Sequence, residues 1–221
     1  MDFFLTSLSL FKRLPEKALK ELSQKVFLRR FGKGQAVFMD GDPPHSVYLL
    51  KSGLIKAVKY SRREEPVIME IISPKGLFGM IALLDQKPYP VTALCICDSE
   101  LYEIPAKVFE NLLKTHPDFS QAVYSEIGEH LRQSQALRAI AREPAPQRIA
   151  FILGLLSKSV GKDLAITRED ISEMSGTTEE TAIRVLSDFR KKKLIISGWK
   201  KITVLNPEKL EKYASSLSKE N

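Results

Sequence analysis

The sequence has little of what a disulfide framework, a membrane anchor or an exported protein would need. Its 221 residues include two cysteines, Cys95 and Cys97, which are too close together in the chain to bridge comfortably. The longest apolar stretch, 149–156, has eight residues including one glycine, whereas a membrane-spanning helix needs about 20. The N-terminus is apolar but contains Asp2 and no basic segment, unlike a secretory signal. We therefore expect a cytoplasmic protein with no membrane partner.

Histidine is also scarce. The three histidines, His45, His116 and His130, are scattered over the first 130 residues. No Ser/His/Asp arrangement, metal-ligand spacing or phosphate-binding loop stands out in the sequence. We therefore expect no catalytic residues and no metal site, and a protein that is not an enzyme.

Positive charge is concentrated in the C-terminal third. The chain has 34 basic and 27 acidic residues, and residues 147–221 hold 14 of the basic and 10 of the acidic ones. Within Arg184–Lys201, seven cations accompany one acid, Asp188. Such a cluster attracts a polyanion, although a run of cations also serves simply to solvate the end of a helix.

The N-terminal half reads as short helices followed by a β domain. Apolar spacing over 5–27 predicts two short helices, the second starting after Pro15. From 27 to 104, short apolar runs alternate with turns rich in glycine and proline, which predicts an antiparallel sandwich or barrel. The clearest strand candidates are Ala36–Phe38, Val47–Leu50, Leu54–Val58 and Val67–Ile72.

A long helix is predicted between Pro117 and Pro144, where Gly128 is the only glycine. A helix of this length extends about 39 Å, more than the β domain alone would cover. A narrow seam on alternating three- and four-residue steps predicts a dimer interface with a partner helix. The alternative is that the helix packs only on its own β domain. The seam consists of Val123, Ile127, His130, Ser134, Leu137 and Ala141.

Two consecutive helix starts follow the break at Glu143–Pro146. Thr167 with Asp170 resembles a capping box, Gly176 supplies a turn, and Thr177 or Thr178 caps a second helix. This spacing predicts a helix-turn-helix, whose second helix enters the DNA major groove. The apolar contacts that fix the helix crossing are expected from Ile171, Met174, Ala182, Ile183, Val185 and Leu186.

The second helix presents the candidate base-reading residues Glu179, Glu180 and Arg184. Glutamate accepts from cytosine and arginine pairs with guanine, and Glu180 is also spaced to brace Arg184. The alternative is a plain surface ion pair. A hairpin over 194–205, centred on Gly198 and including Trp199, would act as a wing. Candidate contacts to the DNA backbone are Thr167, Arg168, Thr178, Thr181, Lys200 and Lys201.

The order of these parts resembles the Crp/Fnr superfamily of bacterial transcription regulators. Gly34–Asp42 and Val47–Leu54 look like the family's cyclic-nucleotide-binding-like roll, and Thr167–Ile195 looks like its winged helix-turn-helix. The resemblance covers nearly the whole chain. It implies an α+β protein with an antiparallel β-roll sensory domain (1–116), a long dimerisation helix (117–143) and a winged helix-turn-helix DNA-binding domain (144–221).

The resemblance also implies a mode of action. Members of this family form homodimers that bind a palindromic operator in double-stranded DNA when an effector occupies the roll. The implied partners are DNA, a second copy of the chain and RNA polymerase, and the protein would act as an activator or a repressor. The alternative is a cyclic-nucleotide-binding-like module that acts through protein partners.

The effector pocket departs from the family pattern. Gly76–Asp85 and Pro90–Ala93 occupy the place of the phosphate-binding cassette, where the cyclic-AMP receptors use a glutamate and an arginine; Met80 and Pro90 stand there instead. A phosphate without a charged partner loses several kcal/mol, so we expect no cyclic-AMP binding. The expected pocket residues are Gly79, Met80, Val91, Thr92, His130 and Ser134.

Two other cofactors found in the family, an iron–sulfur cluster and a haem, differ in whether the sequence offers ligands for them. The iron–sulfur cluster of the Fnr branch needs an N-terminal cysteine cluster, which the chain lacks. A haem that senses carbon monoxide or nitric oxide stays open as an alternative, with His130 as the first candidate axial ligand. The other candidates are His45, His116, Met80, Cys95 and Cys97, although cysteine on a strand also serves as a small hydrophobe.

Overall fold

The computed structural model describes residues 3–62, 64, 66–198 and 200–215. The chain forms two compact units, Met1–Ser134 and Gln135–Asn221. The division falls inside the long helix α5 (Pro117–Ile140). The sequence predicts this helix as a segment of its own over 117–143, whereas in the structure its first part belongs to the N-terminal unit.

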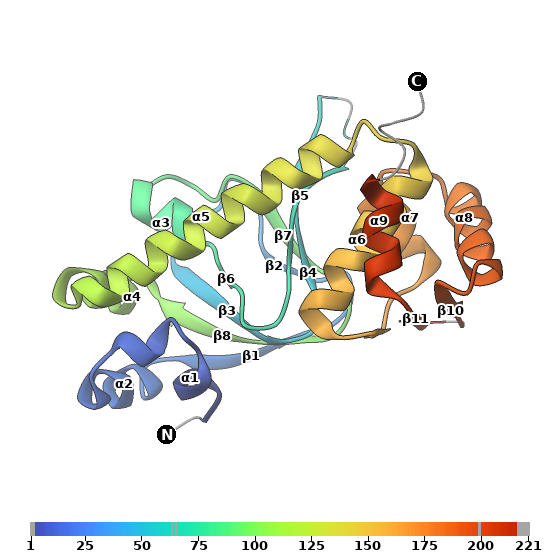
Figure 1. Cartoon of the computed structure of the whole chain (residues 1–221). Helices are drawn as coiled ribbons and strands as arrows, with labels where there is room; N and C mark the ends of the chain where they lie inside the picture. The colour runs from blue at the N-terminus through green and yellow to red at the C-terminus, as the bar shows by residue number, and fades with distance from the viewer. Residues whose placement is uncertain (1–2, 63, 65, 199, 216–221) are drawn as a thin grey trace. The chain divides into compact units, whose positions relative to one another are not determined.

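The N-terminal unit begins with two short helices and a 3₁₀ turn, as the apolar spacing predicts. Eight strands follow in the described part of the unit, and helices α4 and α5 complete it (Figure 1). The bounds are α1 Phe3–Ser7, the 3₁₀ turn Phe11–Arg13, α2 Glu16–Ser23, β1 Phe27–Phe31, β2 Ala36–Phe38, β3 Ser46–Ser52, β4 Ile55–Tyr60, β5 Pro66–Ile72, β6 Leu77–Phe78, α3 Met80–Asp85, β7 Thr92–Cys95, β8 Ser99–Pro105 and α4 Ala106–Thr115.

The described strands form two four-stranded sheets, ordered β1-β8-β3-β6 and β2-β7-β4-β5. Every pairing is antiparallel, which confirms the antiparallel β-roll. In the first sheet Tyr48 of β3 lies opposite Glu103 of β8. The pairing of β4 with β5 shifts register at Ala57/Val58, and such an irregularity increases the local twist of a strand.

Two apolar clusters stabilise the roll. One contains Phe38, Tyr48, Phe78, Tyr89 and Leu101 and lies inside the roll. The other joins the N-terminal helices, α4 and the start of α5 to the outer side of the β3–β8 sheet. Burying these side chains contributes about 1.5–3 kcal/mol each, so the first part of α5 is held firmly on the roll.

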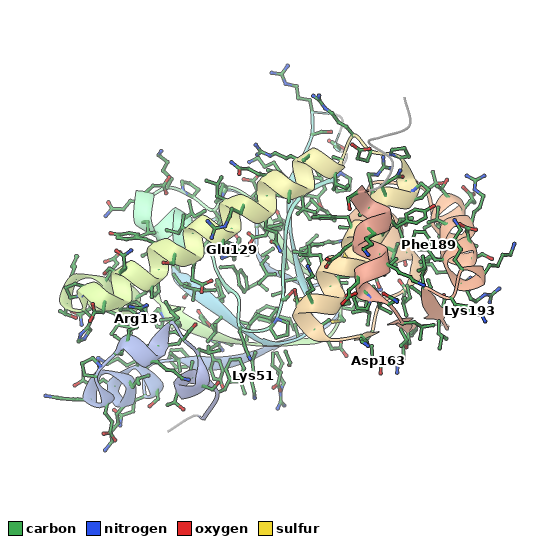
Figure 2. The ribbon with its side chains drawn as sticks, in the orientation of Figure 1. Arg13, Lys51, Glu129, Asp163, Phe189 and Lys193 are labelled. Atoms are coloured by element: carbon green, nitrogen blue, oxygen red, sulfur yellow. The ribbon has the colours of Figure 1, made fainter. Side chains whose placement is uncertain are left out.

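The C-terminal unit is a small helical domain with a three-stranded sheet ordered β10-β11-β9 over the described residues (Figure 1). The break between α5 and α6 lies at 141–144, as the prolines predict. Phe189 of α8, labelled in Figure 2, is fully buried. Its ring lies edge-on to that of Tyr213 on α9, with 5.1 Å between the centroids. The bounds are α6 Ala145–Val160, β9 Asp163–Leu164, α7 Arg168–Ser175, α8 Glu179–Lys191, β10 Ile195–Ser197, β11 Ile202–Val204 and α9 Pro207–Ser215.

The described residues form neither a membrane-spanning helix nor a cluster of metal-binding side chains. None of the helices in this part of the chain is long and apolar enough to cross a membrane. The same part of the chain holds no group of three or more histidine, cysteine or acidic side chains placed to bind a metal ion.

Candidate nucleic-acid interface and roll cavity

Helix α7 begins with a complete capping box. The Thr167 hydroxyl accepts from the Asp170 N–H at 3.1 Å, and the Asp170 carboxylate accepts from the Thr167 N–H at 2.7 Å. This satisfies two N–H groups that a helix start otherwise leaves without partners. The Thr167 hydroxyl also donates to Asp170 at 2.8 Å. Both donors of Thr167 are therefore used inside the cap, and its contact to a DNA phosphate stays a prediction.

The turn between α7 and α8 is built as the sequence predicts. Gly176 ends α7 in the left-handed conformation, with φ of 59°, which glycine adopts without strain. Thr178 then caps α8, and its hydroxyl accepts from the Thr181 N–H at 3.3 Å. Of the two caps that the sequence leaves open, Thr178 is therefore the one used.

Arg148 of α6 fastens this turn, although the sequence gives no sign of it. Its guanidinium donates to the carbonyl oxygens of Ser175 at 2.6 Å and Gly176 at 3.0 Å. A third bond, of 2.9 Å, reaches the Glu143 carbonyl in the linker before α6. Because each hydrogen bond from a charged donor contributes about 1.5–3 kcal/mol, Arg148 is a main support of the reader.

Helix α8 separates a buried from an exposed face. Ala182, Val185 and Leu186 are buried against the rest of the unit. Glu179, Glu180 and Arg184 are all exposed, in line with their expected base-reading role. Glu180 and Arg184, both among the described residues, form no ion pair with each other. The predicted contact by which Glu180 would hold Arg184 in place is therefore not made.

Ile183 lies on this exposed face, between the acidic residues and Arg184. Helical spacing predicts Ile183 among the contacts that fix the helix crossing, but its side chain is 38% exposed. This is a correction, because Ala182, Val185 and Leu186 already supply the apolar contacts of α8. An exposed apolar side chain beside Arg184 is suited to touch a thymine methyl group.

The wing follows α8 as a hairpin of β10 and β11. Gly198 N–H donates to the Lys201 carbonyl at 2.8 Å, closing the turn. Trp199 lies outside the described residues. Strand β9, which the sequence analysis did not predict, pairs with β11 and brings Asp163 within 3.1 Å of the Lys201 ammonium.

The other residues predicted to contact the DNA backbone differ in the hydrogen bonds and ion pairs that they make within the protein. Arg168 and Lys200 have exposed side chains. The Thr178 hydroxyl donates to that of Thr181 at 3.1 Å, which leaves the Thr181 hydroxyl hydrogen free to point outward. Lys201 pairs with Asp163 and has to leave this exposed pair to reach a phosphate, at a cost under about 1 kcal/mol.

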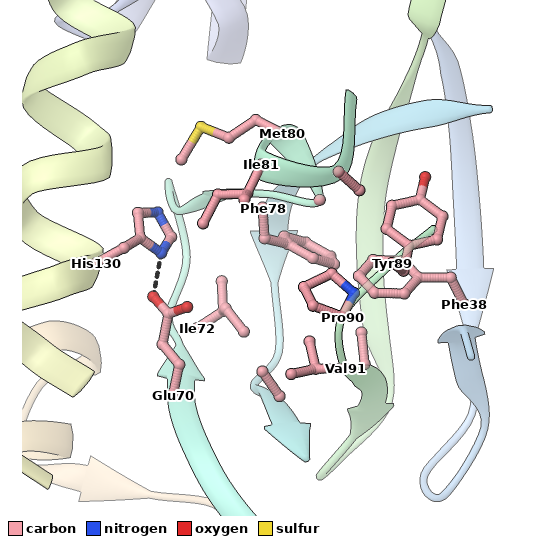
Figure 3. Close-up of a pocket in the computed structure, with 14 residues that line it drawn as sticks. Phe38, Glu70, Ile72, Phe78, Met80, Ile81, Tyr89, Pro90, Val91 and His130 are labelled. Carbon is pink, nitrogen blue, oxygen red and sulfur yellow. Dashed lines mark ion pairs between the residues drawn. The ribbon is translucent and has the colours of Figure 1, made fainter. Parts of the chain in front are cut away.

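The roll encloses a cavity of about 70 Å³ beside α5 (Figure 3). Its walls are mainly apolar, with an aromatic side where Phe38 stacks on Tyr89 at 3.8 Å between centroids. The full lining consists of Phe38, Ala57, Glu70, Ile72, Phe78, Gly79, Met80, Ile81, Ala82, Tyr89, Pro90, Val91, Ala93 and His130.

Four of the six expected pocket residues line this cavity: Gly79, Met80, Val91 and His130. Thr92 and Ser134 are not among the lining residues. Thr92 is next to Val91 on β7, where side chains alternate between the two faces of the sheet, and its hydroxyl accepts from the Asp40 N–H at 3.0 Å. These two assignments are therefore corrected.

His130 and Glu70 form an ion pair at one end of the cavity (Figure 3). Burial lowers the pKa of His130, but the hydrogen bond to Glu70, the charges of Glu70 and Glu126, and a bond to the backbone of Leu77 outweigh this effect and raise it. His130 is thus favoured in its charged form. The sequence offers no sign of Glu70, because it lies on a distant strand.

This ion pair predicts a pH-dependent stability. A histidine whose folded pKa is raised stabilises the fold fully below its ordinary value of 6.5, and this contribution is lost as the pH rises through the folded pKa. We expect the free energy of unfolding to fall over that window by up to about 1.4 kcal/mol per pH unit. Urea unfolding at a series of pH values measures it.

Glu70→Gln is expected to remove most of this slope, since it removes the main cause of the raised pKa. His45→Gln is the control, because His45 is exposed in the turn before β3, and its slope should match that of the wild type. An unchanged slope in Glu70→Gln would contradict the assignment of the ion pair.

Several of the candidate haem ligands are engaged elsewhere or lie away from the cavity. His130 engages Glu70 and the backbone of Leu77, and a cavity of about 70 Å³ is far smaller than a porphyrin ring. Burial raises the pKa of Cys95 to about 11, which disfavours the thiolate that binds iron. His45 is exposed and His116 half-buried in the turn before α5, away from the cavity lining.

The first half of the predicted dimer seam, from Val123 to His130, packs on the chain's own roll. Val123 is fully buried in the cluster beneath α5, and Ile127 packs against the same cluster. His130 pairs with Glu70, and Ser134 is half-buried. In the C-terminal unit, Leu137 is buried while Ala141 is exposed.

A different stripe of α5 is exposed. Tyr124 is 59% and Leu131 58% exposed, and Gly128 lies between them at spacings of four and three residues, on one face of the helix. This exposed stripe lies about 100° around the helix from Val123 of the predicted seam.

Two family models match most of this architecture. Residues 28–116 match the cyclic nucleotide-binding domain, which corresponds to the roll and α4. Residues 147–213 match the Crp-like helix-turn-helix domain, which corresponds to the C-terminal unit from α6 to α9.

Similar proteins have the same two parts. The chain is 25% identical over 199 residues to the global nitrogen regulator of Synechococcus elongatus, covering 85% of this chain and 90% of that protein. It is 28% identical to the fumarate and nitrate reduction regulatory protein of Vibrio cholerae, covering 94% and 86%. The solved structure of FixK2 from Bradyrhizobium japonicum has the same fold, with a TM-score of 0.75 at 20% identity, over 85% of this chain and 96% of that one.

The two domains follow each other in the order found in these regulators, and the helix-turn-helix has its caps, turn and exposed reading face in place. The chain therefore belongs to the Crp/Fnr superfamily of DNA-binding transcription regulators.

Proposed function

We propose that the protein binds a two-fold symmetric DNA operator as a homodimer and regulates transcription in response to a small effector held in the roll. The observation that carries this proposal is the exposed face of α8, with Glu179, Glu180, Ile183 and Arg184. Residues at the start of a recognition helix read base edges in the major groove. Two such helices would contact half-sites one helical turn, about 34 Å, apart.

The exposed stripe of α5 supports the homodimer. Tyr124 and Leu131 are large apolar side chains that are exposed on the same face of α5. Exposed apolar patches of this kind often mark an interface with another protein. In a two-fold dimer each stripe packs against its own copy, so one helix face suffices for the whole interface. Gly128 between them lets the two helix backbones approach closely.

The cavity beside α5 supports control by an effector. His130 of α5 contacts both Glu70 on β5 and the backbone of Leu77 on β6. A molecule that binds here and displaces the His130 side chain would therefore change the contacts that hold α5 on the roll. Ligands act by binding one arrangement better than another. We propose an effector other than cyclic AMP and other than a haem-bound gas. RNA polymerase is the proposed partner of the DNA-bound dimer.

Lys200 tests the proposed backbone contact of the wing. Lys200→Ala is expected to weaken binding to all duplexes alike, because a phosphate contact carries no sequence information. It should also reduce the slope of log K against log salt by about one unit. Fluorescence anisotropy at four salt concentrations measures both. Lys158→Ala on α6, which removes a cation from outside the reader, should leave the slope unchanged.

The function as a whole is tested by selecting binding sites from a random duplex library with the full chain. We expect enrichment of a palindrome and a complex of two chains per duplex in sedimentation analysis. Enrichment of no sequence, or one chain per selected duplex, would overturn the proposal.

A further inference from the structure

The roll cavity owes its space to small residues. Ala57 on β4, Ala82 on α3 and Ala93 on β7 all line it and are buried. Gly79 has φ of 81°, and a Cβ placed there would lie 3.2 Å from the Tyr89 ring. A larger side chain at any of these positions would fill the space. The cavity is therefore encoded in the sequence, and is not a gap left by loose packing.

The charge of the cavity excludes an anion. Glu70 and His130 are the ionisable acid and base among the described lining residues, and they neutralise each other. The lining residues that the structure describes include no lysine and no arginine. Pro90 has no backbone N–H to donate. A phosphate or carboxylate would lose its hydration here without gaining a cation.

The size of the cavity limits the ligand further. About 70 Å³ is roughly half of a cavity of about 150 Å³ that binds benzene. By this scale a chain of about three or four carbon atoms matches the space, and the rim at Pro90 and Ile81 is exposed. The Glu70–His130 pair at one end offers the polar partner for a single hydroxyl or N–H group.

We propose that the roll cavity binds a small, uncharged, mainly aliphatic molecule with one polar end, placed beside Glu70 and His130. The site therefore takes a ligand of a class different from a cyclic nucleotide. The ligand's regulatory role rests on the effector-responsive function proposed above, whereas its binding does not.

The test compares probes that share one carbon chain. The full chain, labelled with ¹³C in its isoleucine and valine methyl groups, is titrated at pH 7 with 1-butanol, with butyrate and with cyclic AMP. We expect 1-butanol to shift the Ile72 and Val91 signals to saturation at millimolar concentration. Butyrate should bind at least tenfold more weakly, because its charge has no partner, and cyclic AMP should cause no saturable shift at Ile72 and Val91.

Two variants place the binding in the cavity. Val91→Phe should abolish the 1-butanol shift at Ile72, and Val67→Phe is its matched control, because Val67 on β5 is exposed and outside the lining. Ala93→Val is a smaller filling change, used if Val91→Phe does not fold. Butyrate or cyclic AMP binding as tightly as 1-butanol, or 1-butanol binding unaffected by filling the cavity, would overturn the inference.

Anisotropy of a selected operator duplex with and without 1-butanol separates the two proposals. A change in DNA affinity in the wild type but not in the filled variant supports the regulatory role. Saturable methyl shifts with unchanged DNA affinity would keep the ligand class and overturn the effector-responsive function.

Discussion

Leu131→Glu is expected to make the proposed dimer monomeric and to lower the affinity for a selected palindromic operator by about 100-fold or more. The change would bring one negative charge from each copy into the proposed interface, where both would be desolvated. Losing the second reader removes the gain from simultaneous binding, which is typically 10²–10⁴-fold. Sedimentation velocity gives the oligomeric state, and anisotropy gives the affinity.

Ser125→Glu provides the matched control. Ser125 is exposed on the same helix but lies about 100° around it from Tyr124, and the variant has the same change in charge. We expect it to stay dimeric and to bind the operator as the wild type does. A Leu131→Glu protein that remains dimeric would show that the exposed stripe is not the interface.

Arg184→Ala is expected to weaken binding to the selected operator by about 1–3 kcal/mol, or about 5- to 150-fold. Its guanidinium is exposed on the reading face and is suited to pair with guanine through two hydrogen bonds. The loss should be confined to duplexes that carry one particular base pair, and the variant should tolerate substitution there. Anisotropy on a panel of single-base operator variants measures this.

Arg190→Ala separates base reading from general charge. Arg190 is exposed at the far end of α8 and carries the same charge. Its removal should lower the affinity for all duplexes by about the same factor, and this factor should be smaller than the loss that Arg184→Ala causes on the selected operator. If Arg184→Ala also weakens every duplex equally, Arg184 contacts the DNA backbone and not a base.

The parts of the fold that the sequence predicted well are those fixed by neighbouring residues. The capping box of Thr167 and Asp170 and the wing turn at Gly198 depend on contacts within three residues, and Gly176 is a local signal for the end of α7. Apolar runs separated by turns likewise predicted the strands. Such features are visible in a single sequence because cause and effect lie close together in the chain.

Which face of α5 packs on the roll and which is exposed could not be predicted in this way. A narrow apolar seam is what a helix needs to pack on another helix, and it is equally what α5 needs to pack on its own roll. Val123 and Tyr124 are adjacent in sequence but lie on the buried and exposed faces. Only the position of the sheet beneath the helix decides between them.

The site residues missed by the sequence analysis all act over long distances in the chain. Glu70 pairs with a histidine 60 positions later, and Arg148 bonds to residues 27 and 28 positions later. Neither residue belongs to a recognisable motif. Ile183 was misplaced for a related reason, because helical spacing alone does not show how far an apolar face extends.

The three bonds of Arg148 join parts that would otherwise move separately. One side chain ties the last peptide before α6, at Glu143, to the corner between the two reading helices. A rotation of the connecting peptide is thus transmitted to that corner through the hydrogen bonds of Arg148. The connecting peptide and the helix-turn-helix are consequently expected to move together, because the Arg148 guanidinium is bonded to both.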